Sequence, residues 1–191
     1  LLSRGNLDDR LGYLNVRNTL LELIEHKVIP IINENDVVAI EEITGENFGD
    51  NDTLSAMVAN LIDADLLIIL GEVKGLFTAD PNLDPAAHLI PKVDRLTEDI
   101  TSKGGPPRDH RGSGGMATKL DAARLATASA VNVVIASGTE NNIIKKLAIG
   151  EDVGTLFPAT STKMESRKRW MLSGLSTQRY VLVDKGAATA L

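Results

Sequence analysis

The chain has 191 residues, 43% of them hydrophobic, which is enough for one domain with a sizeable core and part of a second. A net charge of −6 argues against a general binder of nucleic acid or anionic membranes, and the lack of cysteine excludes disulfides and thiolate metal sites. We see no signal peptide and no apolar run of the roughly 18 residues that a transmembrane helix needs. We therefore expect a cytoplasmic protein without membrane contact.

The first predicted elements are a helix and a buried strand. Leu and Ile recur at helical spacing across residues 6–26, which predicts an amphipathic helix. The apolar run at residues 28–32 (VIPII) predicts a buried strand. The polar cluster after it, residues 33–36 (NEND), is typical of an Asx-rich turn. Alternatively, Asp36 at this strand end accepts hydrogen bonds from a substrate ammonium or hydroxyl group.

A hairpin and a second helix are predicted next. Residues 37–48 alternate loosely and favour the hairpin, and the polar cluster at residues 49–52 (GDND) opens the helix. The apolar face of this helix is expected to contain Leu54, Met57, Val58 and Leu61. Asp and Asn are favoured helix caps, but capping needs only one such residue. The alternative is that one carboxylate orients lysine side chains while Asn51 binds substrate.

Further along the chain, strands and helices alternate. Residues 66–70 (LLIIL) and 131–136 predict buried strands, and residues 141–149 predict a short helix. Residues 72–93 are expected to be loop-rich and residues 101–115 to form a mobile surface segment. This alternation predicts an α/β fold, a three-layer αβα sandwich with a mainly parallel sheet. Ligands bind such sheets beyond the carboxyl ends of the strands.

The glycine-rich run at residues 112–119 (GSGGMATK) precedes a helical pattern. Glycines let backbone N–H groups approach a ligand closely, and a helix N-terminus suits an anion such as phosphate. Lys119, about one turn into the helix, would add a full positive charge. The spacing does not fit a Walker A loop. The alternative is a flexible loop followed by an Ala-rich core helix, and the segment alone does not separate the two.

The alternating pattern ends near residue 158. Residues 161–174 contain a basic stretch and predict a linker, and residues 178–184 (QRYVLVD) resemble a strand. We therefore expect a first domain over residues 1–160 and the start of a second over residues 175–191.

Four motifs, in this order, resemble the glutamate 5-kinases of the amino acid kinase family. They are residues 33–36 (NEND), 48–52 (FGDND), 75–81 (GLFTADP) and 114–119 (GGMATK). Downstream, residues 167–170 (RKRW) resemble the end of that kinase domain, and residues 183–187 (VDKGA) resemble the start of the small β-rich PUA domain that follows it in bacterial members. The resemblance implies the amino acid kinase fold for residues 1–160, as the C-terminal part of that domain, and the start of a PUA domain for residues 175–191.

The resemblance also implies an activity. Glutamate 5-kinases transfer a phosphoryl group from ATP to the γ-carboxylate of L-glutamate. The product is L-glutamyl 5-phosphate, and the reaction is the first step of proline biosynthesis. Mg²⁺ would be held through the nucleotide phosphates, with no metal site of the protein's own. Proline inhibition, a homo-oligomer and RNA binding through the PUA domain are further expectations. Two alternatives remain: another amino acid kinase, such as an acetylglutamate or aspartate kinase, and a non-catalytic fragment or RNA-binding module.

Individual roles follow from the matching positions. Asp36 and Asn51 would bind glutamate, Asp52 would organise the catalytic lysines, and Lys119 would stabilise the transferred phosphoryl group. The ATP site would consist of Gly71, Glu72, Ser113, Gly114, Gly115, Met116, Ala117, Thr118 and Lys119.

The chain departs from the family pattern at several points. The family's first lysine and its glycine-rich strand turn have no counterpart here and are expected upstream of Leu1. Gly71-Glu72 stands where the family usually has Thr-Asp, and Ser113 replaces a usual threonine. Residues 104–111 (GGPPRDHR) do not resemble the family's usual loop. Because the first of the two catalytic lysines has no counterpart here, a fragment with these residues alone is expected to be inactive.

Overall fold

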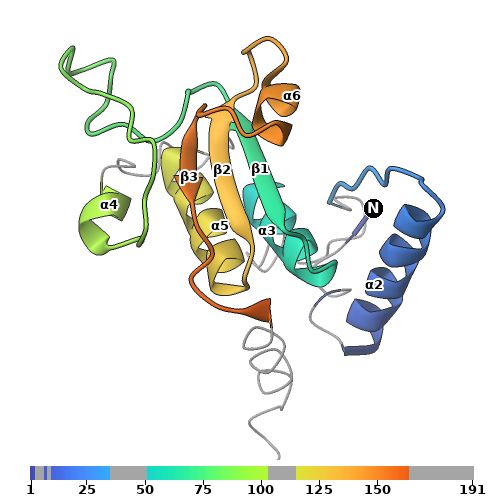
Figure 1. Ribbon diagram of the computed structural model, residues 1–191. Helices are drawn as coiled ribbons and strands as arrows, with labels where there is room; N and C mark the ends of the chain where they lie inside the picture. The colour runs from blue at the N-terminus through green and yellow to red at the C-terminus, as the bar shows by residue number, and fades with distance from the viewer. Residues whose placement is uncertain (3–6, 8–9, 35–50, 103–114, 164–191) are drawn as a thin grey trace, which may run out of the picture.

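The computed structural model describes residues 1–2, 7, 10–34, 51–102 and 115–163. Figure 1 shows a central sheet with helices packed against it and one helix set to the side. The elements are α2 (Arg10–Glu25), α3 (Asn51–Leu61), β1 (Leu66–Gly71), α4 (Glu98–Ser102), α5 (Met116–Ala128), β2 (Asn132–Ser137), α6 (Ile143–Ala148) and β3 (Thr155–Phe157).

The sheet has three strands in the order β1-β2-β3 within the described residues. β1 and β2 are parallel, from the pair Leu66 and Asn132 to the pair Gly71 and Ser137. This confirms the strands predicted at residues 66–70 and 131–136. β3 runs antiparallel to β2, so the described sheet is mixed, whereas we predicted a mainly parallel one. Three residues are too few to show a periodic pattern, which is why β3 had no sequence signal.

Helices cover both faces of this sheet. Successive residues of a strand point to opposite faces. Val133 and Ile135 of β2 therefore belong to the core shared with α3 and α5, while Val134 and Ala136 pack with Ile143 of α6. This arrangement agrees with the three αβα layers that we predicted.

α3 and α5 lie against each other on one face of the sheet (Figure 1). Their shared core contains small side chains, Ala56 and Ala59 from α3 and Ala122, Ala123 and Ala126 from α5, all nearly inaccessible to solvent. Small side chains let two helices approach closely. The close approach brings together the first turns of both helices, which carry several of the predicted site residues.

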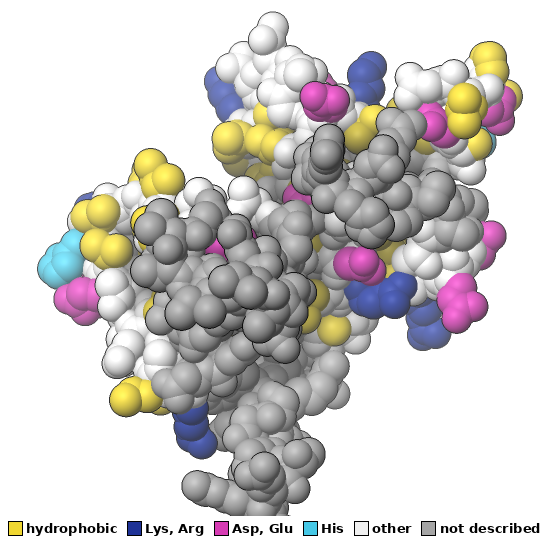
Figure 2. Space-filling view, turned by 180° about the vertical axis from the view of Figure 1, so that it is seen from behind, with side chains coloured by type: hydrophobic (Ala, Val, Ile, Leu, Met, Phe, Trp, Pro, Cys, Tyr) yellow, Lys and Arg dark blue, Asp and Glu magenta, His cyan; other side chains and the backbone are white. Residues whose placement is uncertain are grey.

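Residues 28–32 do not form the buried strand that we predicted. They have no regular secondary structure, and Ile29 and Ile31 are 87% and 95% exposed. The nearest strand-like pairing is a single bridge between Leu2 and Glu34. A strand needs a hydrogen-bonded neighbour, and nothing in the described ranges pairs with residues 28–32. Hydrophobic side chains reach the surface on the side of α2, at the left of Figure 2.

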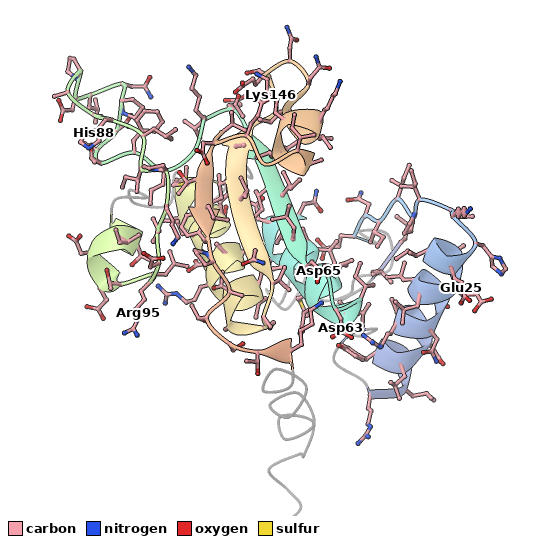
Figure 3. All side chains as sticks on the ribbon, viewed as in Figure 1. Glu25, Asp63, Asp65, His88, Arg95 and Lys146 are labelled. Carbon is pink, nitrogen blue, oxygen red and sulfur yellow. The ribbon has the colours of Figure 1, made fainter. Side chains whose placement is uncertain are left out.

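α2 is held to the rest of the chain through α3. Leu20 of α2 shares a small core with Leu54 and Leu61 of α3. Arg17 adds an ion pair with Asp63, which lies in the loop before β1 (Figure 3). Among the described residues, the apolar contacts of α2 are thus made mainly with α3.

The remaining predictions have mixed outcomes. Residues 72–93 contain neither helix nor strand, as predicted, whereas α4 was not predicted. The predicted hairpin at residues 37–48 and second domain at residues 175–191 lie outside the described residues, as does most of the surface segment at 101–115. No helix in the part of the chain that is described has the length and hydrophobicity to cross a membrane.

Candidate functional site

Two charged side chains meet where α3 and α5 begin. Lys119, the fourth residue of α5, donates a hydrogen bond from Nζ to Oδ2 of Asp52, the second residue of α3, at 2.9 Å. The lysine side chain is 10% exposed and the aspartate side chain 15% exposed. A charge removed from water to this extent is costly unless it has a partner. The pair therefore holds an ammonium group at a fixed place beside two helix N-termini.

Thr118 ties the same two turns together. Its hydroxyl oxygen lies 3.0 Å from Oδ2 of Asp52 and 2.9 Å from the carbonyl oxygen of Gly115. The single hydroxyl proton serves one of these acceptors at a time. Ser55 donates a hydrogen bond to the backbone carbonyl of Asp52 at 2.7 Å, which secures the first turn of α3. Asp52 is thus fixed from both helices.

α5 begins without a side-chain cap. Gly115 occupies the cap position in an extended conformation, with φ −70° and ψ −177°. Among the residues that the structure describes, no atom lies within 4 Å of a Cβ atom built on Gly115. Met116 and Ala117 complete a first turn whose backbone N–H groups lack helical partners. Such a terminus, together with the Lys119 ammonium, favours an anion.

The carboxyl ends of β1 and β2 lie beside this lysine. A Cβ built on Gly71 would lie 2.9 Å from Cε of Lys119, so the lysine stem crosses the end of β1. Glu72 has an exposed side chain, and its carbonyl oxygen accepts a hydrogen bond from the Ser137 hydroxyl at 3.3 Å. The Ser137 hydroxyl also lies 2.8 Å from that of Thr139. No individual role was predicted for either hydroxyl. Ser137 is the last residue of β2 and Thr139 follows two residues later, so their position at a strand end was a usable signal.

Asn51 lines a groove and, unlike its neighbour Asp52, does not belong to the cluster around Lys119. The groove has a volume of about 460 Å³ and lies between α3, β1 and residues 32–33. The other lining residues are mostly apolar: Ile32, Asn33, Leu54, Ser55, Val58, Ala59, Ile62, Ala64, Leu66 and Leu67. Consecutive helix residues point about 100° apart, which explains why Asn51 and Asp52 serve separate surroundings.

The structure thus brings together part of the predicted site. Asp52, Gly71, Thr118 and Lys119 form one cluster, with Gly115, Met116 and Ala117 at the helix start next to it. Asp36, Ser113 and Gly114 lie outside the described residues. Across the described ranges, no three His, Asp or Glu side chains are grouped so that they could hold a metal ion.

The cluster can stabilise the negative charge on a phosphoryl group during its transfer. Phosphoryl transfer relies on positioning and on positive charge or N–H donors near the phosphate oxygens. Here a fixed ammonium group lies beside a helix N-terminus that has no side-chain cap.

Comparison with known proteins agrees with this chemistry. A family model described as "Amino acid kinase family" matches residues 3–137. The chain is 56% identical over 191 residues to a glutamate 5-kinase of Dehalococcoides mccartyi, and 51% identical to one of Herpetosiphon aurantiacus. Each alignment covers 100% of this chain and 51% of the relative. The chain therefore spans about half the length of the curated relatives that it matches.

The fold has solved counterparts as well. The crystal structure of UMP kinase from Bacillus anthracis aligns with a TM-score of 0.54 and 20% sequence identity, over 76% of this chain and 52% of that one. UMP kinase from Ureaplasma parvum aligns with a TM-score of 0.51 and 15% sequence identity. That alignment covers 74% of this chain and 52% of the Ureaplasma chain. These likenesses concern the fold alone. With the family model covering most of its length, the chain belongs to the amino acid kinase family.

Proposed function

We propose that the protein containing this chain transfers the γ-phosphoryl group of ATP to the γ-carboxylate of L-glutamate. The observation that carries this proposal is the buried ion pair of Lys119 and Asp52 beside the uncapped start of α5. The identity of 56% with a glutamate 5-kinase supports the choice of substrate. The bond between the γ-phosphorus and the bridging oxygen of ATP breaks, a carboxylate oxygen of glutamate forms the new bond, and ADP leaves.

The described residues suggest a division of roles. Lys119 stabilises the charge on the transferred phosphoryl group, and Asp52 together with Thr118 fixes the place of that ammonium. No base is needed to take a proton from the acceptor, because a carboxylate is already ionised near neutral pH. Gly71, Glu72 and residues 113–119 would surround the nucleotide.

A nucleotide phosphate would lie beside Gly115, where no side chain of the described residues comes within 4 Å of a Cβ built on that glycine. Mg²⁺, which would neutralise phosphate charge, would be carried mainly by the nucleotide. Oδ2 of the Asp52 carboxylate is engaged by the Lys119 ammonium, so we assign Asp52 to the lysine and not to a metal ion. We propose that Asp36 and Asn51 bind glutamate.

The wider organisation is proposed on the resemblance alone. Residues 1–160 would belong to the kinase domain, residues 161–174 to a linker and residues 175–191 to the start of a PUA domain. Inhibition by proline, assembly into a homo-oligomer, RNA binding through the PUA domain and a cytoplasmic location remain predictions.

The test measures ADP formation by the complete gene product with ATP and Mg²⁺. L-glutamate should be required, and N-acetylglutamate and aspartate should not replace it. Lys119→Ala should lower kcat about 10³-fold, because it removes a preorganised positive charge. Lys163→Ala is the matched control and should retain activity. Lys163 also pairs with an aspartate, at 2.6 Å, but that partner, Asp65, is 91% exposed.

Two outcomes would contradict the proposal. Turnover with N-acetylglutamate or aspartate in place of L-glutamate would assign a different amino acid kinase activity. Salt-sensitive RNA binding without ADP formation in the complete gene product would favour a non-catalytic role.

A further inference from the structure

We propose that Thr155 is a positioning residue for the nucleotide site. Its hydroxyl holds residues 72–76, the segment that leaves the carboxyl end of β1, and so fixes the place from which Glu72 would contact ATP. The consequence for ATP rests on the function proposed above, whereas the contacts of the hydroxyl do not.

Thr155 is the first residue of β3 and is inaccessible to solvent. Its hydroxyl accepts a hydrogen bond from the N–H of Leu76 at 2.9 Å and donates one to the carbonyl oxygen of Ile90 at 2.7 Å. The Ile90 N–H in turn donates to the Leu76 carbonyl at 2.8 Å. One buried hydroxyl therefore joins both ends of the loop formed by residues 77–89, which contains most of the GLFTADP motif.

Two glycines allow the backbones to meet at Thr155. A Cβ built on Gly75 would lie 2.6 Å from Oγ1 of Thr155 and 3.0 Å from its backbone nitrogen. Gly75 also has a φ of +148°, which side chains rarely allow. Gly154 precedes Thr155 with a φ of +80°, and a Cβ there would overlap the carbonyl oxygen of Ile135. The sequence on both sides of the contact is thus suited to this close approach.

The held segment begins beside the Lys119 cluster. Gly71, the last residue of β1, lies beside the lysine stem, and Glu72 follows it. The Glu72 carbonyl accepts the hydrogen bond from Ser137 at 3.3 Å, so the segment is also held at this end. Leu76 is only four residues beyond Glu72, and a shift at Leu76 is carried toward Glu72 through this short length of chain.

Loss of the Thr155 hydroxyl would remove the acceptor of a buried N–H. Leu76 is 1% exposed, and an unpaired N–H in such a place is costly. The segment would regain a partner by moving toward water, and ATP would then bind only the fraction of molecules that keep the original arrangement. The apparent affinity falls in proportion to that fraction. kcat should change less, because Lys119 and Asp52 keep their contact.

Thr155→Val in the complete gene product tests this inference, because valine has nearly the shape of threonine and lacks the hydroxyl. KM for ATP should rise about 10-fold, in line with the cost of one unpaired buried N–H. The Leu76 amide should exchange with deuterium faster, as measured by mass spectrometry of its peptide. Thr155→Ser keeps the hydroxyl and should restore both values.

Thr127→Val is the matched control. Thr127 is also a buried threonine, 3% exposed, but its hydroxyl donates to the carbonyl oxygen of Ala123, one turn earlier in α5, at 2.8 Å. The same substitution there removes a buried hydroxyl without a contact to residues 72–76. Its KM for ATP and its exchange at Leu76 should match those of the unsubstituted protein.

Ser137→Ala keeps the test decisive if Thr155→Val does not fold. It releases the same segment at its other end, where the Glu72 carbonyl loses its hydrogen bond. KM for ATP should rise by a smaller factor, because Glu72 is exposed and water can reach its carbonyl. An unchanged KM for ATP in this variant would then overturn the inference.

Two results with Thr155→Val would also overturn it. Unchanged exchange at Leu76 would show that the hydroxyl does not hold the segment, and faster exchange with an unchanged KM for ATP would show a role in stability alone. Failure of the proposed function has a different signature. If the unsubstituted protein bound ATP without turnover, weaker ATP binding by Thr155→Val in an equilibrium titration would still support the positioning role.

Discussion

Two regions of the molecule begin from similar sequence signals and end differently. One is the sheet region, which comprises β1, β2 and β3 with α3 and α5. The other is the N-terminal region, which comprises α2 and residues 28–34. Each contains a short apolar run, LLIIL at residues 66–70 and VIPII at residues 28–32. The first run pairs with β2 along its length, whereas the second has no ladder among the described residues. An apolar run therefore becomes a strand only where a neighbour satisfies its backbone.

The ion pairs of the two regions differ in how deeply their side chains are buried. Lys119 and Asp52 join α3 to α5 with side chains 10% and 15% exposed. Arg17 and Asp63 join α2 to the loop after α3 with side chains 25% and 23% exposed. Greater burial makes the first pair costlier to disrupt, because the charge left behind is poorly solvated. The sheet region is thus where a single substitution should have the largest consequences.

Among the substitutions that compare the two regions, Asp52→Asn should produce the largest effect. Asparagine keeps the shape of the side chain but removes the charge that holds the Lys119 ammonium. We expect kcat to fall about 10²- to 10³-fold with the fold retained. Steady-state kinetics of the complete gene product provide the measurement. Asp65→Asn is the control, since Asp65 pairs with Lys163 at an exposed site. Equal kcat values for the Asp52 and Asp65 variants would contradict the role of Asp52 in holding the catalytic lysine.

Ile135→Ala should reduce stability more than any substitution considered for the N-terminal region. Ile135 lies in the centre of β2 and is inaccessible to solvent. The cavity left by alanine should lower the free energy of unfolding by about 2–5 kcal/mol, measured by urea denaturation. Ile135→Val should cost about 0.5–1.5 kcal/mol. Similar values for both variants would show that the core collapses to fill the space.

Arg17→Ala should have an intermediate effect. Arg17 donates to Asp63 at 2.7 Å and also to the backbone carbonyl of Leu61, so it connects α2 to the end of α3. We expect the free energy of unfolding to fall by about 1 kcal/mol, as for a partly exposed pair. Glu22→Gln, which removes the negative charge beside His26 at an exposed site, should have almost no effect. An equal fall in the free energy of unfolding for both variants would show that the more buried ion pair contributes no more than the exposed one.

Ile31→Ser should have the smallest effect. The Ile31 side chain is 95% exposed, so its replacement removes little buried apolar area. The free energy of unfolding of the complete gene product should change by no more than about 0.5 kcal/mol. A loss comparable to that of Ile135→Ala would show that Ile31 is covered in the complete protein. The contrast between the two apolar runs would then disappear.

The sequence alone determined the elements whose signals are local. Alanine and leucine at helical spacing predicted α5, and two apolar runs predicted β1 and β2, because periodicity reports which face an element buries. The motifs around Asp52 and Lys119 indicated phosphate chemistry. The same local signals were wrong for residues 28–32, since an apolar run does not specify its partner, and they missed β3, which is only three residues long.

Only the tertiary structure decided how the site is assembled. Asp52 and Lys119 are 67 residues apart in the chain, and the packing of α3 against α5 brings their charged atoms to 2.9 Å. The motifs place Gly71 in the predicted ATP site, and only the structure shows that the stem of Lys119 also lies beside it. Contacts of this kind depend on the relative placement of separate elements, which local propensity does not encode.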